Sequence, residues 1–83
     1  MRLRTDGITW QEVDGELVIL DLNRSAYLTT NSSGSFLAKH LVDERSREEL
    51  VAALAQEFDI ERERAEIDVD TFVDVLRDKR LLA

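Results

Sequence analysis

Residues 8–21 set the architecture of the chain and read Ile8-Thr9-Trp10-Gln11-Glu12-Val13-Asp14-Gly15-Glu16-Leu17-Val18-Ile19-Leu20-Asp21. Apolar and polar residues alternate over the first six positions, which is the pattern of a half-buried strand. The Asp-Gly pair that follows favours a type I′ turn, because both central positions of that turn need positive φ. The last six residues include Leu17-Val18-Ile19-Leu20, a run that is apolar on both faces and contains two β-branched residues. The stretch therefore predicts a β-hairpin.

The chain on the C-terminal side of this hairpin predicts one more strand and then only helices. Residues 23–25 form a polar turn, and Ala26 to Thr30 is rich in strand formers, so a third strand follows at the edge of a meander. Asn31, Ser32 and Ser33 are capping residues for a helix that runs to Val42.

Two further helices are expected. Ser46 and Glu49 have the spacing of a capping box, ahead of an apolar stripe that ends at Phe58. We expect Asp59 to cap a third helix that runs to about Lys79. Its apolar face comprises Ala65, Val69, Phe72, Val73 and Leu76. Leu81 and Leu82 would pack back on the sheet. The predicted fold class is α+β, winged helix-turn-helix-like, with a three-stranded antiparallel sheet followed by three helices in one domain spanning residues 1–83.

Composition narrows the functional classes. The 83 residues contain no cysteine, no apolar run long enough to span a membrane and no secretory signal at the start, so we expect a cytoplasmic protein without membrane association. Asp and Glu total 18 against 11 Lys and Arg. This acidic balance argues against nucleic acid as a partner and favours a basic one, although an acidic surface also simply keeps a protein soluble.

No catalytic or cofactor motif is present. His40 is the only histidine, and its place near a helix end suits an interaction with the helix dipole. The chain has no nucleophile elbow and no glycine-rich phosphate loop. We therefore expect no enzyme activity, no cofactor and no metal.

Two features could mark a binding surface. The acidic rail, Glu66, Asp70 and Asp74 with Asp78 beyond them, places carboxylates four residues apart on one helix face beside Val69 and Val73. It either meets a basic partner or is a solvated face. The expected edge strand at residues 26–30 carries no charge, so it is either covered by a helix or open to an added strand.

Three segments together resemble PqqD-like proteins, the recognition elements for ribosomally synthesised and post-translationally modified peptides (RiPPs). They are Trp10-x-x-Val13-Asp14-Gly15, Tyr27-x-x-x-Asn31-x-x-Gly34, and Asp68-Val69-x-x-Phe72-Val73-x-x-Leu76 before Leu81-Leu82. Within that family the chain is most similar to stand-alone leader-binding proteins of split lasso-peptide systems. Thr30 and Ala38 depart from the leucine and tryptophan that the family commonly has there.

The resemblance implies that a precursor leader peptide, with a Tyr-x-x-Pro motif, adds as a strand beside the third strand and is presented to a leader peptidase and a macrocyclase. The implied contacts are Ala26, Tyr27, Leu28, Thr29 and Thr30 in the strand and Val69, Phe72, Val73 and Leu76 in the helix. We expect Val73 to be accessible and to line the tyrosine pocket, and Phe72 to belong to the core.

Two other functions stay open. A winged-helix transcription factor shares the expected elements, but residues 59–83 hold eight acidic and five basic residues, whereas a DNA-reading helix should be basic. An acidic carrier domain for phosphopantetheine should have Asp-Ser-Leu at a helix start, which this chain lacks.

Overall fold

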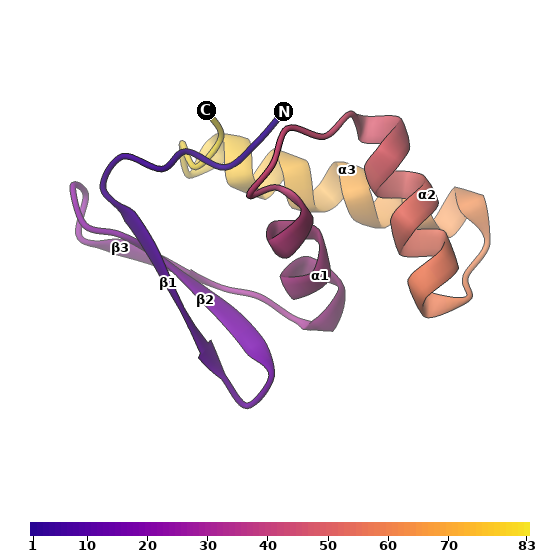
Figure 1. Cartoon of the computed structure of the whole chain (residues 1–83), viewed down its shortest axis with the longest axis horizontal. Coiled ribbons are helices and arrows are strands. Elements are labelled where there is room, and N and C mark those ends of the chain that lie inside the picture. Colours follow the sequence, from indigo (N-terminus) through magenta and orange to yellow (C-terminus); the bar gives the residue numbers. More distant parts are fainter.

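The computed structural model describes residues 1–83 and consists of three strands followed by three helices (Figure 1). β1 (Ile8–Val13), β2 (Glu16–Asp21) and β3 (Ala26–Thr29) form an antiparallel sheet in the order β1-β2-β3. Both the fold class and the element order that the sequence predicts are confirmed. β1 and β3 are the two edges of this sheet, so each has one side without a strand partner.

The β1–β2 hairpin closes through the predicted Asp-Gly turn. Asp14 and Gly15 have φ of 54° and 81°, which are the positive values that this turn type needs. Val13 pairs with Glu16 directly across the turn, which fixes the register of the whole ladder. Leu17 and Ile19 consequently point inward and are buried.

The helices are α1 (Ser32–His40), α2 (Arg47–Phe58) and α3 (Arg62–Asp78). The Asn31 side chain accepts a hydrogen bond from the Gly34 N–H at 2.9 Å and so caps α1. Ser46 and Glu49 form the predicted capping box of α2. The expected role of Asp59 is wrong: it adopts a left-handed conformation with φ 50° and ψ 50° and ends α2, so α3 starts three residues later.

The core lies where α1 sits between the sheet and the pair α2 and α3 (Figure 1). Each helix contributes one apolar stripe to the core. β2 and both ends of the chain contribute further buried apolar residues. Leu3 pairs with Leu82 in an antiparallel bridge outside the three-stranded sheet, and Leu81 is buried in the core cluster that includes Leu17 and Ile19 of β2, so the C-terminal leucines fold back on the core and the N-terminal segment. None of the three helices is both long and apolar enough to cross a membrane.

Candidate functional site

The open edge of β3 faces α3 across a groove. The groove has a volume of about 570 Å³, within the range of pockets that hold ligands. Leu28 of β3 lies on one side, and Phe72 and Val75 of α3 lie on the other; all three are half-buried. The remaining lining residues are Glu16, Thr29, Thr30, Asn31, Ser33, Gly34, Asp68 and Thr71.

The hydrogen-bond pattern shows which β3 backbone groups are free. Thr30 N–H donates to Leu17 C=O at 3.1 Å, so residue 30 points its backbone polar groups toward β2. Because this direction alternates along a strand, the N–H and C=O of Tyr27 and Thr29 point toward the open edge. These are the groups that an added strand would use.

A buried hydroxyl pair ends β3 and joins it to α1. The Thr30 hydroxyl donates to Leu17 C=O at 2.6 Å and lies 2.6 Å from Ser35 Oγ, which in turn accepts from Leu17 N–H at 2.9 Å. Both side chains are buried, so each hydroxyl is satisfied inside the protein. Thr30 therefore holds the groove in place, and this hydrogen bonding explains how threonine fits a position where the family commonly has leucine.

Three of the expected helix-wall residues are core residues. Val69 and Leu76 have no exposed surface, and Val73 is 6 % exposed. The expectation that Val73 is accessible is wrong; Phe72, expected in the core, packs against the core but is only half-buried and lines the groove. The cause is the rotation of α3: its stripe Ala65, Val69, Val73 and Leu76 packs inward, which turns Phe72 toward the groove.

The expected strand residues divide between two faces. Leu28, Thr29 and Thr30 line the groove, whereas Tyr27 is 66 % exposed and lies across from Leu20 on the outer face of the sheet. Successive side chains of a strand point to opposite faces, so the Leu28 and Thr30 side chains share the inner face, while Thr29, on the same face as Tyr27, lines the groove from the strand edge. Ala26, at the start of β3, is exposed and outside the groove.

Sequence reasoning missed Ser33 of α1 and four further residues of the α3 and α1 walls. Asp68, Thr71 and Val75 line the groove together with Phe72, and their spacing of three and four residues is itself a helical stripe. That stripe could have been found from the sequence as the one that flanks the core stripe. Gly34 is the fourth: a Cβ there would lie 3.2 Å from the Phe72 ring and 3.2 Å from Thr30 Cβ, so α1 approaches α3 closely at this point.

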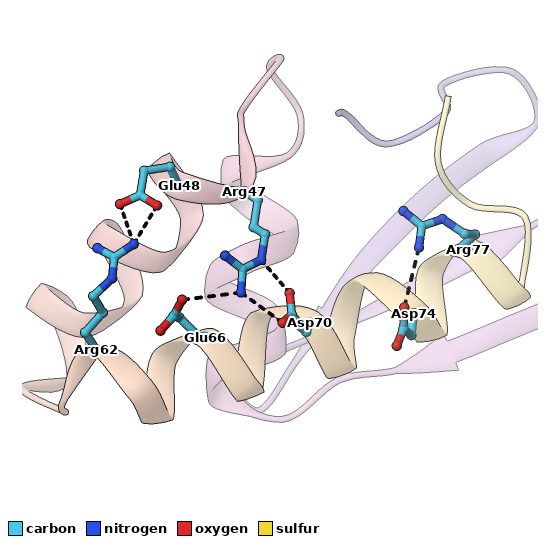
Figure 2. Close-up of polar contacts among 7 residues, drawn as sticks. All are labelled: Arg47, Glu48, Arg62, Glu66, Asp70, Asp74 and Arg77. Carbon is cyan, nitrogen blue, oxygen red and sulfur yellow. Dashed lines mark hydrogen bonds and ion pairs between the residues drawn. The ribbon is translucent and has the colours of Figure 1, made fainter.

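The acidic rail lies on the other flank of the buried α3 stripe, where Glu66 and Asp70 face Arg47 of α2 (Figure 2). Arg47 donates to both carboxylate oxygens of Asp70, at 2.7 and 2.9 Å, and lies 3.6 Å from Glu66. Asp74 pairs with Arg77 at 3.4 Å. None of the three rail residues lines the groove, and their part in binding a partner stays a prediction.

These ion pairs shift several pKa values. The hydrogen bonds from Arg47 lower the pKa of Asp70, and those from Arg62 lower the pKa of Glu48. In return, the pKa values of Arg47 and Arg62 are raised. No cluster of three or more His, Asp or Glu side chains is arranged to hold a metal ion.

Comparison with known protein families shows to which family the chain belongs. The family model described as coenzyme PQQ synthesis protein D (PqqD) matches residues 16–82, which include β2, β3, all three helices and every residue that lines the groove. The chain belongs to the PqqD family. As the sequence predicts, it is a PqqD-like RiPP recognition element.

Two solved structures share the fold of this PqqD-family chain along nearly its whole length. One is TbiB1 in complex with the TbiA(beta) leader peptide, with a TM-score of 0.86 and 29 % identity over 99 % of this chain and 94 % of that one. The other is lasso peptide synthetase B1 complexed with the leader peptide, with a TM-score of 0.81 and 28 % identity over 96 % and 93 % of the two chains. No curated protein sequence matches the chain significantly.

Proposed function

We propose that this domain, residues 1–83, binds the leader segment of a ribosomally made precursor peptide, of the lasso-peptide type, by strand addition to β3. The observation that carries the proposal is the open edge of β3 beside an apolar-walled groove. Two unpaired N–H and C=O pairs, at Tyr27 and Thr29, offer main-chain affinity, and the groove offers a pocket for a side chain. Both similar solved structures are complexes with leader peptides.

The pocket for the leader tyrosine would lie between Leu28, Phe72 and Val75. All three are half-buried without a partner, so an aromatic ring placed among them would remove apolar surface from water. Val69, Val73 and Leu76 would act from behind by holding Phe72 and Val75 in place. The DNA-binding alternative is not supported, because both similar structures hold peptides and the groove carries two carboxylates, Glu16 and Asp68.

The domain would act by tethering and not by catalysis. Holding the leader raises the effective concentration of the attached core peptide at a leader peptidase and a macrocyclase that bind the same complex. The site would operate in the cytoplasm, where a chain without cysteine is suited to reducing conditions.

Fluorescence anisotropy tests the binding. The probes are the labelled TbiA(beta) leader, the labelled leaders of precursors encoded beside this chain, and a labelled DNA duplex. We expect a 1:1 complex with at least one leader and none with the duplex. Tight DNA binding together with indifference to every leader would contradict the proposal.

Strand addition is tested separately by removing one N–H from the open edge. Thr29→Pro deletes the N–H that faces the leader, and edge strands tolerate proline at such positions. Thr29→Ala is the matched control, since it removes the same side chain and keeps the N–H. Thr29→Pro should lose binding about tenfold or more relative to Thr29→Ala, with similar melting temperatures. Equal affinities of the two variants would show that the leader does not pair with this edge.

A further inference from the structure

The groove does not end where β3 ends. A second hollow of about 380 Å³, here called the distal pocket, shares Glu16, Asn31, Ser33 and Asp68 with the groove. Its remaining lining residues are Ser32, Leu54, Phe58, Ile60 and Arg64. Four shared residues make the two hollows one continuous channel. The channel runs from the β3 edge past the start of α1 to the turn between α2 and α3.

One part of the wall of the distal pocket, formed by Leu54, Phe58 and Ile60, is apolar and only partly covered. Phe58 at the end of α2 is 38 % exposed, Ile60 in the following turn is half-buried, and Leu54 lies buried behind them. Phe58 packs edge-to-face on Phe36 with ring centroids 5.7 Å apart, which fixes the orientation of the ring. Asp59, which lies between Phe58 and Ile60 and adopts a left-handed conformation, turns the chain. Phe58 and Ile60 therefore both border the pocket.

The junction of the two hollows is acidic. Glu16 is exposed and makes no ion pair, and Asp68 pairs only with Arg64, its neighbour one turn earlier, at 3.2 Å. Both carboxylates line both hollows. An exposed carboxylate without a partner where the two hollows meet favours a cationic group in whatever occupies them.

Strand direction decides which part of a leader reaches this place. β2 and β3 are antiparallel, and antiparallel pairing is the more stable of the two ladders. A leader that adds antiparallel to β3 runs opposite to it, so its N-terminal part lies at the C-terminal end of β3. The distal pocket is at that end.

We propose that the distal pocket is a second subsite for the leader peptide, which takes an apolar side chain N-terminal to the segment that pairs with β3. A Lys or Arg of the leader between the two anchors would lie against Glu16 and Asp68. This inference rests on the proposed function and adds to it a two-anchor requirement: an apolar residue and a basic residue upstream of the strand.

The test is titration calorimetry with whichever leader binds in the anisotropy experiment, as a full-length peptide and as a peptide that lacks the residues N-terminal to its β3-pairing segment. Against the full leader, Ile60→Ala should weaken binding about tenfold, and Glu16→Gln should flatten the salt dependence. Against the shortened leader, Ile60→Ala should not matter, and Glu16→Gln should have a smaller effect than against the full leader, because Glu16 also lines the β3 groove. Ile67→Ala is the matched control, because Ile67 of α3 is 62 % exposed and lines neither hollow.

The outcomes separate the two proposals. If no leader binds, the proposed function fails. If the full and shortened leaders bind equally and Ile60→Ala behaves as Ile67→Ala does, the leader is bound by the β3 groove alone and the second subsite is refuted. Loss of affinity on shortening, without any response to Ile60→Ala or Glu16→Gln, would place the upstream contact elsewhere and equally overturn the proposal.

Discussion

Arg47 of α2 holds Asp70 of α3 through two parallel hydrogen bonds, 2.7 Å from Nε to Oδ1 and 2.9 Å from Nη2 to Oδ2. This is the bidentate geometry in which a guanidinium recognises a carboxylate most strongly. The pair joins the two helices at the surface, on the flank of α3 away from the groove (Figure 2). Asp70 is therefore already occupied within the protein.

The pair predicts a pH-dependent contribution to stability. Because Arg47 lowers the pKa of Asp70, the stabilisation is fully present above the unfolded value of about 3.9 and is lost as the pH falls through the lower folded pKa. Asp70→Asn should be less stable than the wild type at pH 7 and equally stable near pH 2. Urea unfolding at several pH values measures this, and a constant difference from pH 7 to pH 2 would contradict it.

Phe72 and Val73 should separate binding from stability. Phe72 lines the groove, so Phe72→Ala should weaken leader binding by about 2 kcal/mol, roughly thirtyfold. Val73 is buried, so Val73→Ala should cost roughly 1.5–3 kcal/mol of folding stability and leave the affinity of the folded fraction nearly unchanged. Calorimetric titration and thermal melting of both variants check the assignment. If Val73→Ala keeps its melting temperature and loses the leader, the groove lies on the opposite flank of α3.

Gly34 should be needed for the shape of the groove. A methyl group there would lie 3.2 Å from the Phe72 ring, so the ring must move into the groove to make room. Alanine also favours a helix over glycine by about 0.5–1 kcal/mol. We expect Gly34→Ala to melt near the wild-type temperature and to bind the leader severalfold more weakly. A variant that binds as the wild type does would show that the Phe72 ring can move aside without narrowing the groove.

Loss of the Thr30 hydroxyl should lower the free energy of unfolding. Thr30→Val keeps the shape of the side chain and removes the hydroxyl that bonds Leu17 C=O and Ser35, which should cost about 1–3 kcal/mol of unfolding free energy. Chemical denaturation measures the loss. Thr30→Ser, which keeps the hydroxyl, is the control and should recover most of that hydrogen-bond contribution.

The acidic rail should act on a leader only at long range. Glu66, Asp70 and Asp74 lie outside the groove and have arginine partners, so replacing all three with Gln or Asn should change affinity by less than about fivefold. Replacing Asp68 alone, inside the groove, should flatten the salt dependence more. Titrations at low and high salt compare the two variants. A larger effect of the triple substitution would mean that the leader reaches the α2 side of α3.

Local chemistry made most of the fold predictable. Asp14-Gly15, Asn31 and the Ser46 capping box each act within four residues, and all three behave as the sequence predicts. Asp59 was misassigned because aspartate serves both as an N-cap and as a left-handed terminator, and only the packing of Phe58 and Ile60 decides between them.

The groove was predictable only in part. β3 was recognisable as an uncharged edge, but the rotation of α3 was not. The sequence placed Ala65, Val69, Phe72, Val73 and Leu76 on one apolar face, but it could not show which edge of that face is covered; packing buries Ala65, Val69, Val73 and Leu76 and leaves Phe72 half-buried. That rotation places Phe72, and not Val73, at the groove, and leaves the rail on the flank of α3 that does not line the groove.

Leu3 and Leu82 pair as antiparallel neighbours, and Ala83 N–H donates to Arg2 C=O at 2.9 Å, so the chain enters and leaves the fold side by side (Figure 1). Such a unit can be spliced into a surface loop of another protein, because its two ends fit a single opening. Neither end lines the groove. A modifying enzyme could therefore gain peptide binding by insertion of this domain into one of its surface loops, with no change to its own active site.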